Sequence, residues 1–420
     1  MARQFKIDVL EATRLTRQGR LEEAMTVLRD GLSGAPDTDR PADADTGPKD
    51  VVDLVPPSPE TGGAWTAPSA AKTAAPVRVD HAAARPASWL DGMLDLVLDA
   101  GPSARPKARG PRVGTQALVP EGARFEERSF ANEAGRRSYK LYVPHSLAGE
   151  AVPLVVMLHG CTQSPDDFAA GTRMNELAEE HGFIVAYPAQ SHDANASGCW
   201  NWFNAGDQKR DRGEPSLIAG ITRQIMEEFP VNPDRVFAAG LSAGGATAAI
   251  MGATYPDLFR AIGVHSGLAC GAARDMPSAF AAMRQGGSPA PCRSDGTVVP
   301  TIVFHGDGDR TVHPVNGMQV VAQAAAQARG EMSLRTTVSS GQSPGGVAYT
   351  KEVHSDAAGH GVLENWVLHG AGHAWSGGSP AGSFTDPKGP DASREMLRFF
   401  LESSHGRAER GRAGRHTPRR

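Results

Sequence analysis

Six short, continuous apolar runs constrain the fold of this chain more than any other feature. They are PLVVMLHG, GFIVAYPA, RVFAAGLS, FRAIGVHSG, TIVFHGDGD and ENWVLHGAGH, and each ends in glycine or polar residues. Strands that are buried on both faces of a parallel sheet have this character. Helical stretches such as RMNELAEEH and SLIAGITRQIMEEF lie between the runs. The alternation predicts an α/β fold with a mostly parallel central sheet and helices on both faces. RSYKLYVP alternates apolar and polar residues, and it predicts an antiparallel strand at an edge of that sheet.

The run RVFAAGL leads directly into a serine that is flanked by glycines. Gly240, Ser242 and Gly244 have the G-x-S-x-G spacing, and the small residues AGGATAAIMGATY that follow predict a helix. In such an elbow, small residues let the strand and the helix pack closely, while a strained backbone lifts the serine hydroxyl above the sheet. The motif alone is weak evidence in a chain with 48 glycines. It predicts a nucleophile only if an acid and a histidine follow in that order.

Two later strand ends supply an acid and a histidine. TIVFHGDGD contains Asp307 and Asp309, and ENWVLHGAGH contains His369 and His373. Open α/β sheets bind ligands at the carboxyl ends of their strands, where these groups are expected to meet. His373 comes after GAG, in the loop beyond the strand, so we predict that it is the base that takes the serine proton. Asp309 lies further into its turn and is predicted to orient the histidine, whereas Asp307 shapes the loop.

The oxyanion that forms during acyl transfer needs hydrogen-bond donors. We predict that one is the backbone N–H of Ala243, directly after the serine, and the other that of Cys161, in the loop after PLVVMLHG. This chemistry requires no metal ion and no organic cofactor.

Three tryptophans lie in segments that are expected to border the cleft. Trp200 and Trp202 belong to CWNWF, and Trp375 lies two residues after the predicted base. Their rings fit either stacking on a substrate or packing in the core.

The chain resembles the polyhydroxybutyrate depolymerase-type esterases, a family with feruloyl and acetylxylan esterase-like members, in six motifs that occur in order: LHGCTQSPDDFAAGTRMNELAEEHGFIVAYP, CWNWF, GLSAGG, HGDGDRTVHPVNG, GAGHAWSGG and FTDPKGPDAS. The resemblance covers residues 124 to 401, and it implies an α/β-hydrolase fold and a serine esterase with the triad Ser242, Asp309 and His373. It implies polyhydroxyalkanoate (3-hydroxybutyrate) polymer or oligomers as the substrate, with feruloyl or acetyl esters of plant polysaccharide as the alternative. The alternative from another class is a non-catalytic α/β-hydrolase-like binding protein.

The four cysteines and the N-terminus lead to opposing expectations. No two cysteines form a CxxC pair, so a zinc site is not expected. MARQFKIDVLEATRL mixes charges into its apolar positions, unlike a secretory signal, and this predicts buried free thiols in a cytoplasmic protein. The family resemblance instead predicts an extracellular protein. The alternative prediction is two disulfides. Loops at one sheet edge come within disulfide range, which favours the pair Cys161–Cys199. Cys270 and Cys292 both lie in the Gly-, Ala- and Pro-rich segment after VHSG, which a bond between them would hold together.

The composition divides the chain into five segments. We expect an N-terminal helical segment over 1–33, a disordered linker over 34–87, a short helix with a basic linker over 88–115, the α/β-hydrolase esterase domain over 116–405 and a basic disordered tail over 406–420. The formal net charge of −4 favours neither nucleic acid nor a membrane surface as a partner, and no apolar run is long enough to span a membrane. The expected partner is therefore the ester substrate, with the oligomeric state left open.

Overall fold

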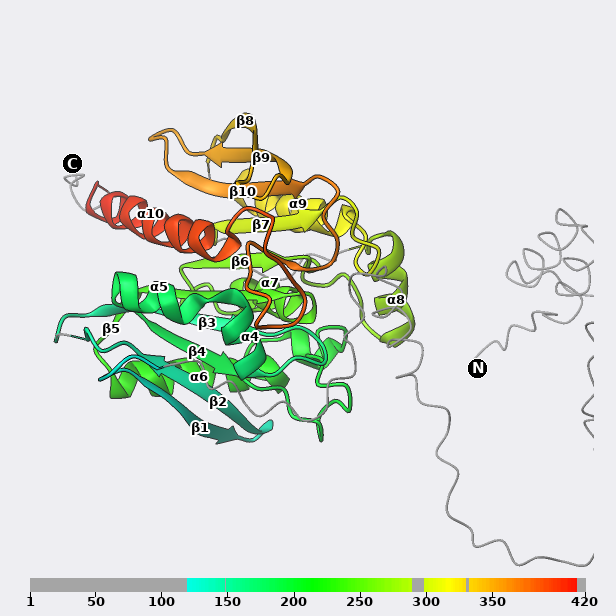
Figure 1. The fold of residues 1–420 in the computed structure, drawn as a ribbon. Helices are drawn as coiled ribbons and strands as arrows, with labels where there is room; N and C mark the ends of the chain where they lie inside the picture. The colour runs from blue at the N-terminus through cyan, green and yellow to red at the C-terminus, as the bar shows by residue number, and fades with distance from the viewer. Residues whose placement is uncertain (1–118, 148, 289–297, 330–331, 414–420) are drawn as a thin grey trace, which may run out of the picture. The chain divides into compact units, whose positions relative to one another are not determined.

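The computed structural model describes residues 119–147, 149–288, 298–329 and 332–413 (Figure 1). The predicted segments 1–33, 34–87 and 88–115 lie outside the described residues. Within the described ranges, none of the helices is long and apolar enough to cross a bilayer.

A ten-stranded sheet forms the centre of the described part, in the order β1-β2-β4-β3-β5-β6-β7-β10-β9-β8. The inner strands β4, β3, β5, β6, β7 and β10 all pair in parallel. Their bounds are β3 Val152–Leu158, β4 Ile184–Pro188, β5 Val231–Leu241, β6 Ala261–His265, β7 Thr301–Gly306 and β10 Gly361–Leu368. These strands contain the six apolar runs, so the prediction of a mostly parallel sheet is confirmed.

Antiparallel strands complete both sides of the sheet. β1 (Arg124–Asn132) and β2 (Gly135–Val143) pair with each other, and β2 also pairs with β4. On the other side, β9 (Ala348–Ser355) pairs with β10 and with the edge strand β8 (Arg335–Gln342). The prediction that RSYKLYVP forms an edge strand is wrong, because β1 covers that side of β2. Its alternating pattern reports a half-buried face, and β1 supplies the missing hydrogen bonds.

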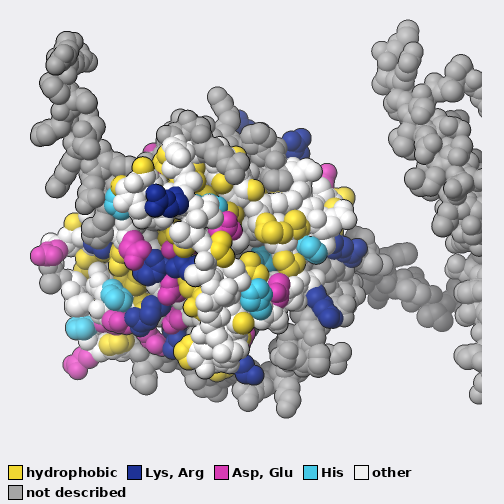
Figure 2. All heavy atoms as spheres, turned by 90° about the horizontal axis from the view of Figure 1, so that it is seen from above, with side chains coloured by type: hydrophobic (Ala, Val, Ile, Leu, Met, Phe, Trp, Pro, Cys, Tyr) yellow, Lys and Arg dark blue, Asp and Glu magenta, His cyan; other side chains and the backbone are white. Residues whose placement is uncertain are grey.

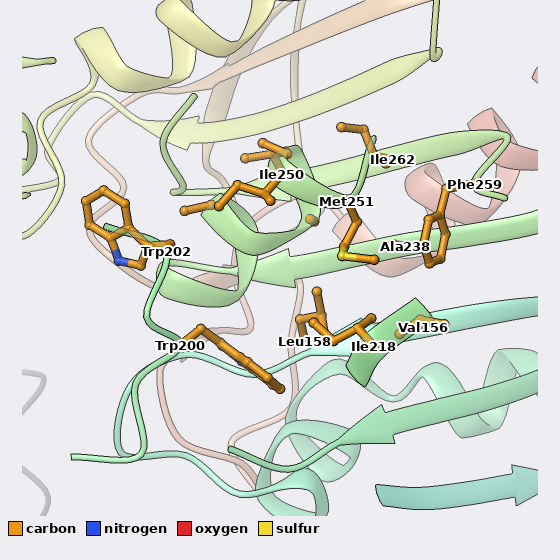
Figure 3. Packing of buried hydrophobic residues seen from close by; sticks show 14 of the residues in the cluster. Val156, Leu158, Trp200, Trp202, Ile218, Ala238, Ile250, Met251, Phe259 and Ile262 are labelled. Atoms are coloured by element: carbon orange, nitrogen blue, oxygen red, sulfur yellow. The ribbon is translucent and has the colours of Figure 1, made fainter. Parts of the chain in front are cut away.

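Two hydrophobic cores lie on the two faces of the sheet. Successive residues of β3 alternate between them, so that Val156 and Leu158 contribute to one core and Val155 and Met157 to the other. The first core contains residues of α6 (Gly213–Glu228), α7 (Ala243–Thr254), α8 (Met276–Gln285) and α9 (Val315–Arg329), and Figure 3 shows part of it. The second contains residues of α4 (Pro165–Thr172), α5 (Met174–His181) and α10 (Ala392–Ala413).

The C-terminal helix α10 continues to Ala413 and therefore enters the tail 406–420 that was predicted to be disordered. The segment 406–413 is GRAERGRA, in which arginine, alanine and glutamate favour helix, and the anchored turns before it remove the cost of nucleation.

The surface seen from above in Figure 2 has acidic and basic side chains interspersed, with no extended patch of one sign on that face of the described part.

Candidate active site

Ser242 lies on a sharp turn between β5 and α7, with φ 57° and ψ −119°. A positive φ at a residue other than glycine is strained backbone, which surrounding packing must hold in place. The two flanking glycines provide that packing. A Cβ on Gly244 would lie 2.0 Å from the carbonyl oxygen of Leu158, and a Cβ on Gly240 would lie 2.4 Å from the backbone of Gly244. Strand, turn and helix can approach this closely only with glycine at both positions.

The backbone around the elbow presents two unused donors. The N–H of Ala243 opens α7, where no carbonyl of the same helix can accept it. The loop after β3 lies against the elbow, since a Cβ on Gly160 would be 3.7 Å from the Cβ of Ser242. Cys161 follows in that loop. Among the described residues, the N–H groups of Ala243 and Cys161 donate no hydrogen bond. Both predicted oxyanion donors therefore belong to segments that pack against the serine.

Asp309 and His373 form a buried pair in the segments that follow β7 and β10. Asp309 follows β7, and its Oδ2 accepts a hydrogen bond from His373 Nδ1 at 2.7 Å. Its Oδ1 accepts the backbone N–H groups of Thr311 and Val312, both at 2.9 Å. The side-chain exposure is 6% for His373 and 0% for Asp309. Both carboxylate oxygens are thus fixed, and the bond at Nδ1 leaves Nε2 as the ring nitrogen available for proton transfer.

The carboxyl group of Asp309 is strongly acidic. Burial alone would raise its pKa, but the neighbouring imidazole of His373, with smaller contributions from His305 and the N–H of Val312, lowers the pKa from 3.8 to about 2. Asp309 therefore stays ionised throughout the range in which a histidine titrates, as the orienting group of a triad must.

This acidity leads to a prediction about stability. A carboxyl whose pKa is lower in the folded state stabilises the fold fully above pH 3.8 and loses that contribution as the pH falls towards 2. We expect Asp309→Asn to lower the free energy of unfolding at pH 4 by an amount on the order of 2 kcal/mol. This gap in the free energy of unfolding between the variant and the wild type should narrow between pH 4 and pH 2. Urea unfolding at several pH values measures the gap, and a gap that stays constant down to pH 2 would contradict the assignment.

A second aspartate–histidine pair lies on the surface close by in the sequence. His369 Nδ1 donates to Asp307 Oδ2 at 2.9 Å, and the N–H of Gly370 donates to Asp307 Oδ1. His369 Nε2 lies 2.9 Å from Thr350 Oγ1 on β9. Both side chains of the pair are 43% exposed, and the contacts connect β9 with the loops after β7 and β10. The pair thus has the loop-shaping place that was predicted for Asp307.

A third residue, His265, is hydrogen-bonded both to the serine and to the segment that follows the predicted base. The N–H of Ser242 donates to the carbonyl oxygen of His265 at 2.9 Å, while the His265 ring accepts the N–H of Ser376, three residues after His373. Among the described residues there is no hydrogen bond between the Ser242 hydroxyl and His373. In substrate-free sites this bond is often long and tightens only in the reacting complex.

A disulfide joins Cys161 to Cys199, with the two Cα atoms 4.2 Å apart. A backbone hydrogen bond joins the same two segments, since the N–H of Thr162 donates to the carbonyl oxygen of Ser197 at 3.0 Å. The bond holds the loop after β3 against the segment that follows β4, as expected for adjacent parallel strands. Cys292 lies outside the described residues, so the pair Cys270–Cys292 stays a prediction.

We expect this disulfide to support both stability and turnover. It closes a loop with a sequence separation of 38 residues, which corresponds to about 3 kcal/mol in the chain-entropy account. The double substitution Cys161→Ser with Cys199→Ser should lower the melting temperature by roughly 5–10 °C and reduce kcat, since it loosens a predicted oxyanion donor. Calorimetry and ester hydrolysis measure both effects. Peptide mapping with blocked thiols is the control, and free Cys161 and Cys199 in the wild type would refute the bond.

Two of the three tryptophans that were predicted to border a substrate are structural. Trp200 is fully buried, and its indole N–H donates to the carbonyl oxygen of His159 at 3.1 Å. Trp375 is 1% exposed and donates to Ser393 Oγ at 3.0 Å. Neither ring has a free face, so the substrate-binding prediction is wrong for both. Trp202 is 6% exposed and belongs to the same core cluster as Ile250 of α7 (Figure 3), and its contact with a substrate remains a prediction.

Two buried polar residues that the sequence analysis missed support the loops of the site. Gln163 Oε1 accepts the N–H of Gly160 at 2.9 Å, while its amide donates to the carbonyl oxygen of Ser383 at 3.1 Å. Glu214, at the start of α6, accepts the N–H of Asn201 at 2.7 Å, and burial raises its pKa. Both lie in polar segments, Gln163 in GCTQSPDDF and Glu214 in DQKRDRGEPS, so nothing local in the sequence distinguishes them from exposed polar residues.

Other local features do not compete with this site. Within the described ranges, no group of three or more His, Cys, Asp or Glu side chains is arranged to hold a metal ion. A wide hollow lies elsewhere, between the β1–β2 hairpin and α6, and is lined by Phe130, Glu133, Arg223 and Glu227 among others.

The elements and the site together define the class. A mostly parallel sheet carries a serine after β5, an aspartate after β7 and a histidine after β10, which is the chain order of the α/β-hydrolase fold. The solved acetyl xylan esterase from Aspergillus awamori has the same fold, with a TM-score of 0.52 and 21% identity over 66% of this chain and 99% of that one.

Comparison with known sequences identifies the family. The model of the PHB depolymerase esterases matches residues 137–337. An acetylxylan esterase of Coprinopsis cinerea is 31% identical over 276 residues, which cover 61% of this chain and 70% of that protein. Poly(3-hydroxyalkanoate) depolymerase C of Paucimonas lemoignei is 30% identical over 256 residues, which cover 58% of this chain and 60% of that protein. The chain belongs to the PHB depolymerase family of esterases and is a carboxylic ester hydrolase.

Proposed function

We propose that the chain is a serine esterase in which Ser242 is the nucleophile, His373 the general base and Asp309 the group that orients the histidine. The observation that carries the proposal is the buried Asp309–His373 hydrogen bond of 2.7 Å. Both residues come after the strained Ser242 elbow in the sequence, in the segments that follow β7 and β10. The backbone N–H groups of Ala243 and Cys161 serve as the oxyanion donors.

The acylation step follows from this arrangement. His373 Nε2 takes the proton of the Ser242 hydroxyl as its Oγ attacks the ester carbonyl carbon. The carbonyl π electrons move to the oxygen, and the oxyanion accepts the two backbone N–H groups. When the tetrahedral intermediate collapses, the C–O bond to the alcohol breaks, and the imidazolium donates its proton to the departing alkoxide oxygen.

Deacylation repeats the sequence with water as the nucleophile. His373 takes a proton from water, the hydroxide adds to the acyl carbon, and the bond from that carbon to Ser242 Oγ breaks with return of the proton to Oγ. The free acid leaves, and the enzyme is restored. Asp309 remains ionised throughout, and it stabilises the imidazolium that forms in each half-reaction.

For the substrate we propose esters of 3-hydroxybutyrate, as polymer or short oligomers. The support is the similarity to a poly(3-hydroxyalkanoate) depolymerase together with the match to the PHB depolymerase family. Acetyl esters of plant polysaccharide are the second candidate, because this chain covers 70% of an acetylxylan esterase at 31% identity, compared with 60% of the depolymerase at 30% identity. Feruloyl esters are a related option, since a feruloyl esterase B of Neurospora crassa is 27% identical.

A substrate panel separates these candidates. We expect hydroxybutyrate oligomers to be cleaved with a kcat/KM at least tenfold above that for acetylated xylan and methyl ferulate, while p-nitrophenyl acetate reports general esterase activity. Ser242→Ala serves as the control for background hydrolysis. Preference for acetylated xylan would replace the substrate proposal and leave the esterase proposal in place. Complete inactivity on every ester in the panel would instead support the non-catalytic binding protein.

A further inference from the structure

The molecule contains a buried histidine, His265, that the proposed mechanism does not use. It ends β6 and is fully buried. Its ring stacks on Phe304 of β7 at a centroid distance of 5.8 Å and on Trp375 at 5.1 Å. The imidazole therefore lies between the sheet and the segment that follows the predicted base.

His265 makes two hydrogen bonds that lead to different parts of the site. Its carbonyl oxygen accepts the N–H of Ser242 at 2.9 Å, which fixes the elbow. Its ring Nε2 accepts the N–H of Ser376 at 3.0 Å. Ser376 lies three residues beyond His373, so a single residue connects the segment of the nucleophile with the segment of the base.

The contact also fixes the protonation state of the ring. A backbone N–H can only donate, so Nε2 must carry a lone pair, and the ring proton must be on Nδ1. Nδ1 lies 3.2 Å from Ser266 Oγ, which accepts a hydrogen bond from the Nδ1–H group. Burial, with His305 and His373 nearby, lowers the pKa of His265 to about 3, in agreement with a neutral ring.

The backbone beside His265 is held in an unusual conformation. Ser266 has φ 48°, and its N–H donates to the carbonyl oxygen of Phe304 at 2.8 Å. A Cβ on Gly267 would lie 2.8 Å from the backbone of Gly245 in α7. Strained backbone of this kind persists only where the surroundings hold it, and here β7 on one side and α7 on the other hold the segment that follows His265.

We propose that His265 is a positioning residue that sets the distance between Ser242 and His373 through the hydrogen bond from Ser376 to its Nε2. This proposal rests on the proposed triad. If the bond is lost, the N–H of Ser376 is buried without an acceptor, and the loop that carries His373 shifts to satisfy it. A displacement of about 1 Å in a catalytic group can cost on the order of a hundredfold in rate.

The test compares two substitutions of matched size in the full chain. His265→Gln places an acceptor oxygen near the position of Nε2, whereas His265→Met has a similar length and volume and offers only a weakly accepting thioether sulfur. With p-nitrophenyl acetate as substrate, we expect His265→Met to lower kcat about tenfold or more with KM within twofold of the wild type. His265→Gln should recover most of that loss, and both variants should have similar melting temperatures.

Each possible result either supports or overturns the positioning role of His265. Equal kcat values for the Gln and Met variants, or a loss that appears only in KM, would overturn the proposal. Should either variant fail to fold, Ser266→Ala replaces it, because it removes the acceptor of the Nδ1 hydrogen bond and thereby weakens the tautomer that keeps Nε2 free to accept from Ser376. A kcat at least threefold lower with unchanged KM then supports the role, and an unchanged kcat refutes it. Ser242→Ala is measured in parallel, since activity in that variant would mean that the triad itself is wrong.

Discussion

Replacing Ser242 with alanine is expected to abolish ester hydrolysis while the fold remains intact. In the proposed mechanism the hydroxyl is the attacking group, so without it the acyl-enzyme cannot form, and kcat should fall by a factor on the order of 10⁵. The remaining rate would come from the oxyanion donors and substrate binding alone. A serine-directed phosphonate should label Ser242 in the wild type, and peptide mass mapping should find no other modified serine.

A matched control for this variant is Ser339→Ala. Ser339 lies on the exposed edge strand β8, in a segment that packs against none of the proposed catalytic residues. The control should keep the kcat and KM of the wild type. If Ser242→Ala keeps more than a few per cent of the wild-type kcat, Ser242 is not the nucleophile.

The second large effect is expected at His373. Replacing it with alanine removes the group that takes and returns the proton, so kcat should fall by roughly 10⁴-fold or more. His369→Ala is the matched control, because His369 also bonds an aspartate through Nδ1 but is 43% exposed. We expect its kcat to stay within about threefold of the wild type. The opposite ranking of the two histidine variants would exchange their roles.

The aspartates extend the same comparison. Asp309→Asn presents an amide to His373 Nδ1 and favours the wrong tautomer, which in a serine protease triad costs about 10⁴-fold. Asp307→Asn disturbs only the exposed pair and should cost far less. The four variants thus test two aspartate–histidine pairs of the same chemistry. One pair, Asp309–His373, is buried, and the other, Asp307–His369, is exposed.

The parallel sheet could be predicted from the sequence because strands that are covered on both faces are apolar throughout. The outer strands could not be predicted in the same way. β8 has the sequence RTTVSSGQ, and most of its side chains are exposed, so it lacks the apolar face from which a strand is predicted. β2 has the alternating pattern of a half-buried strand, but that pattern does not reveal that β1 pairs with its other side.

The sequence could also assign groups to strand ends, because the chain order of the fold restricts where an acid and a histidine can come from. It could not tell which aromatic side chains reach the surface. Trp200 and Trp375 are buried, and their contacts come from segments distant in the sequence: His159 for Trp200, and Phe168 and His265 for Trp375. His265 was one of 14 histidines, and nothing local in GVHSG distinguishes a positioning role from ordinary packing.

The loop that carries His373 is anchored far from its own position in the chain. Gln163 donates to Ser383 across 220 residues, and Ser393 Oγ donates to the carbonyl oxygen of Thr172 across 221 residues. During synthesis, the elbow and both oxyanion amides therefore emerge long before their last partner does. Contacts of such sequence separation form late, because chain closure precedes any gain from them. If His373 is the base, as proposed, a nascent chain that ends before residue 373 is expected to be catalytically silent, and the appearance of esterase activity would mark the closing of the last loop rather than the formation of the sheet.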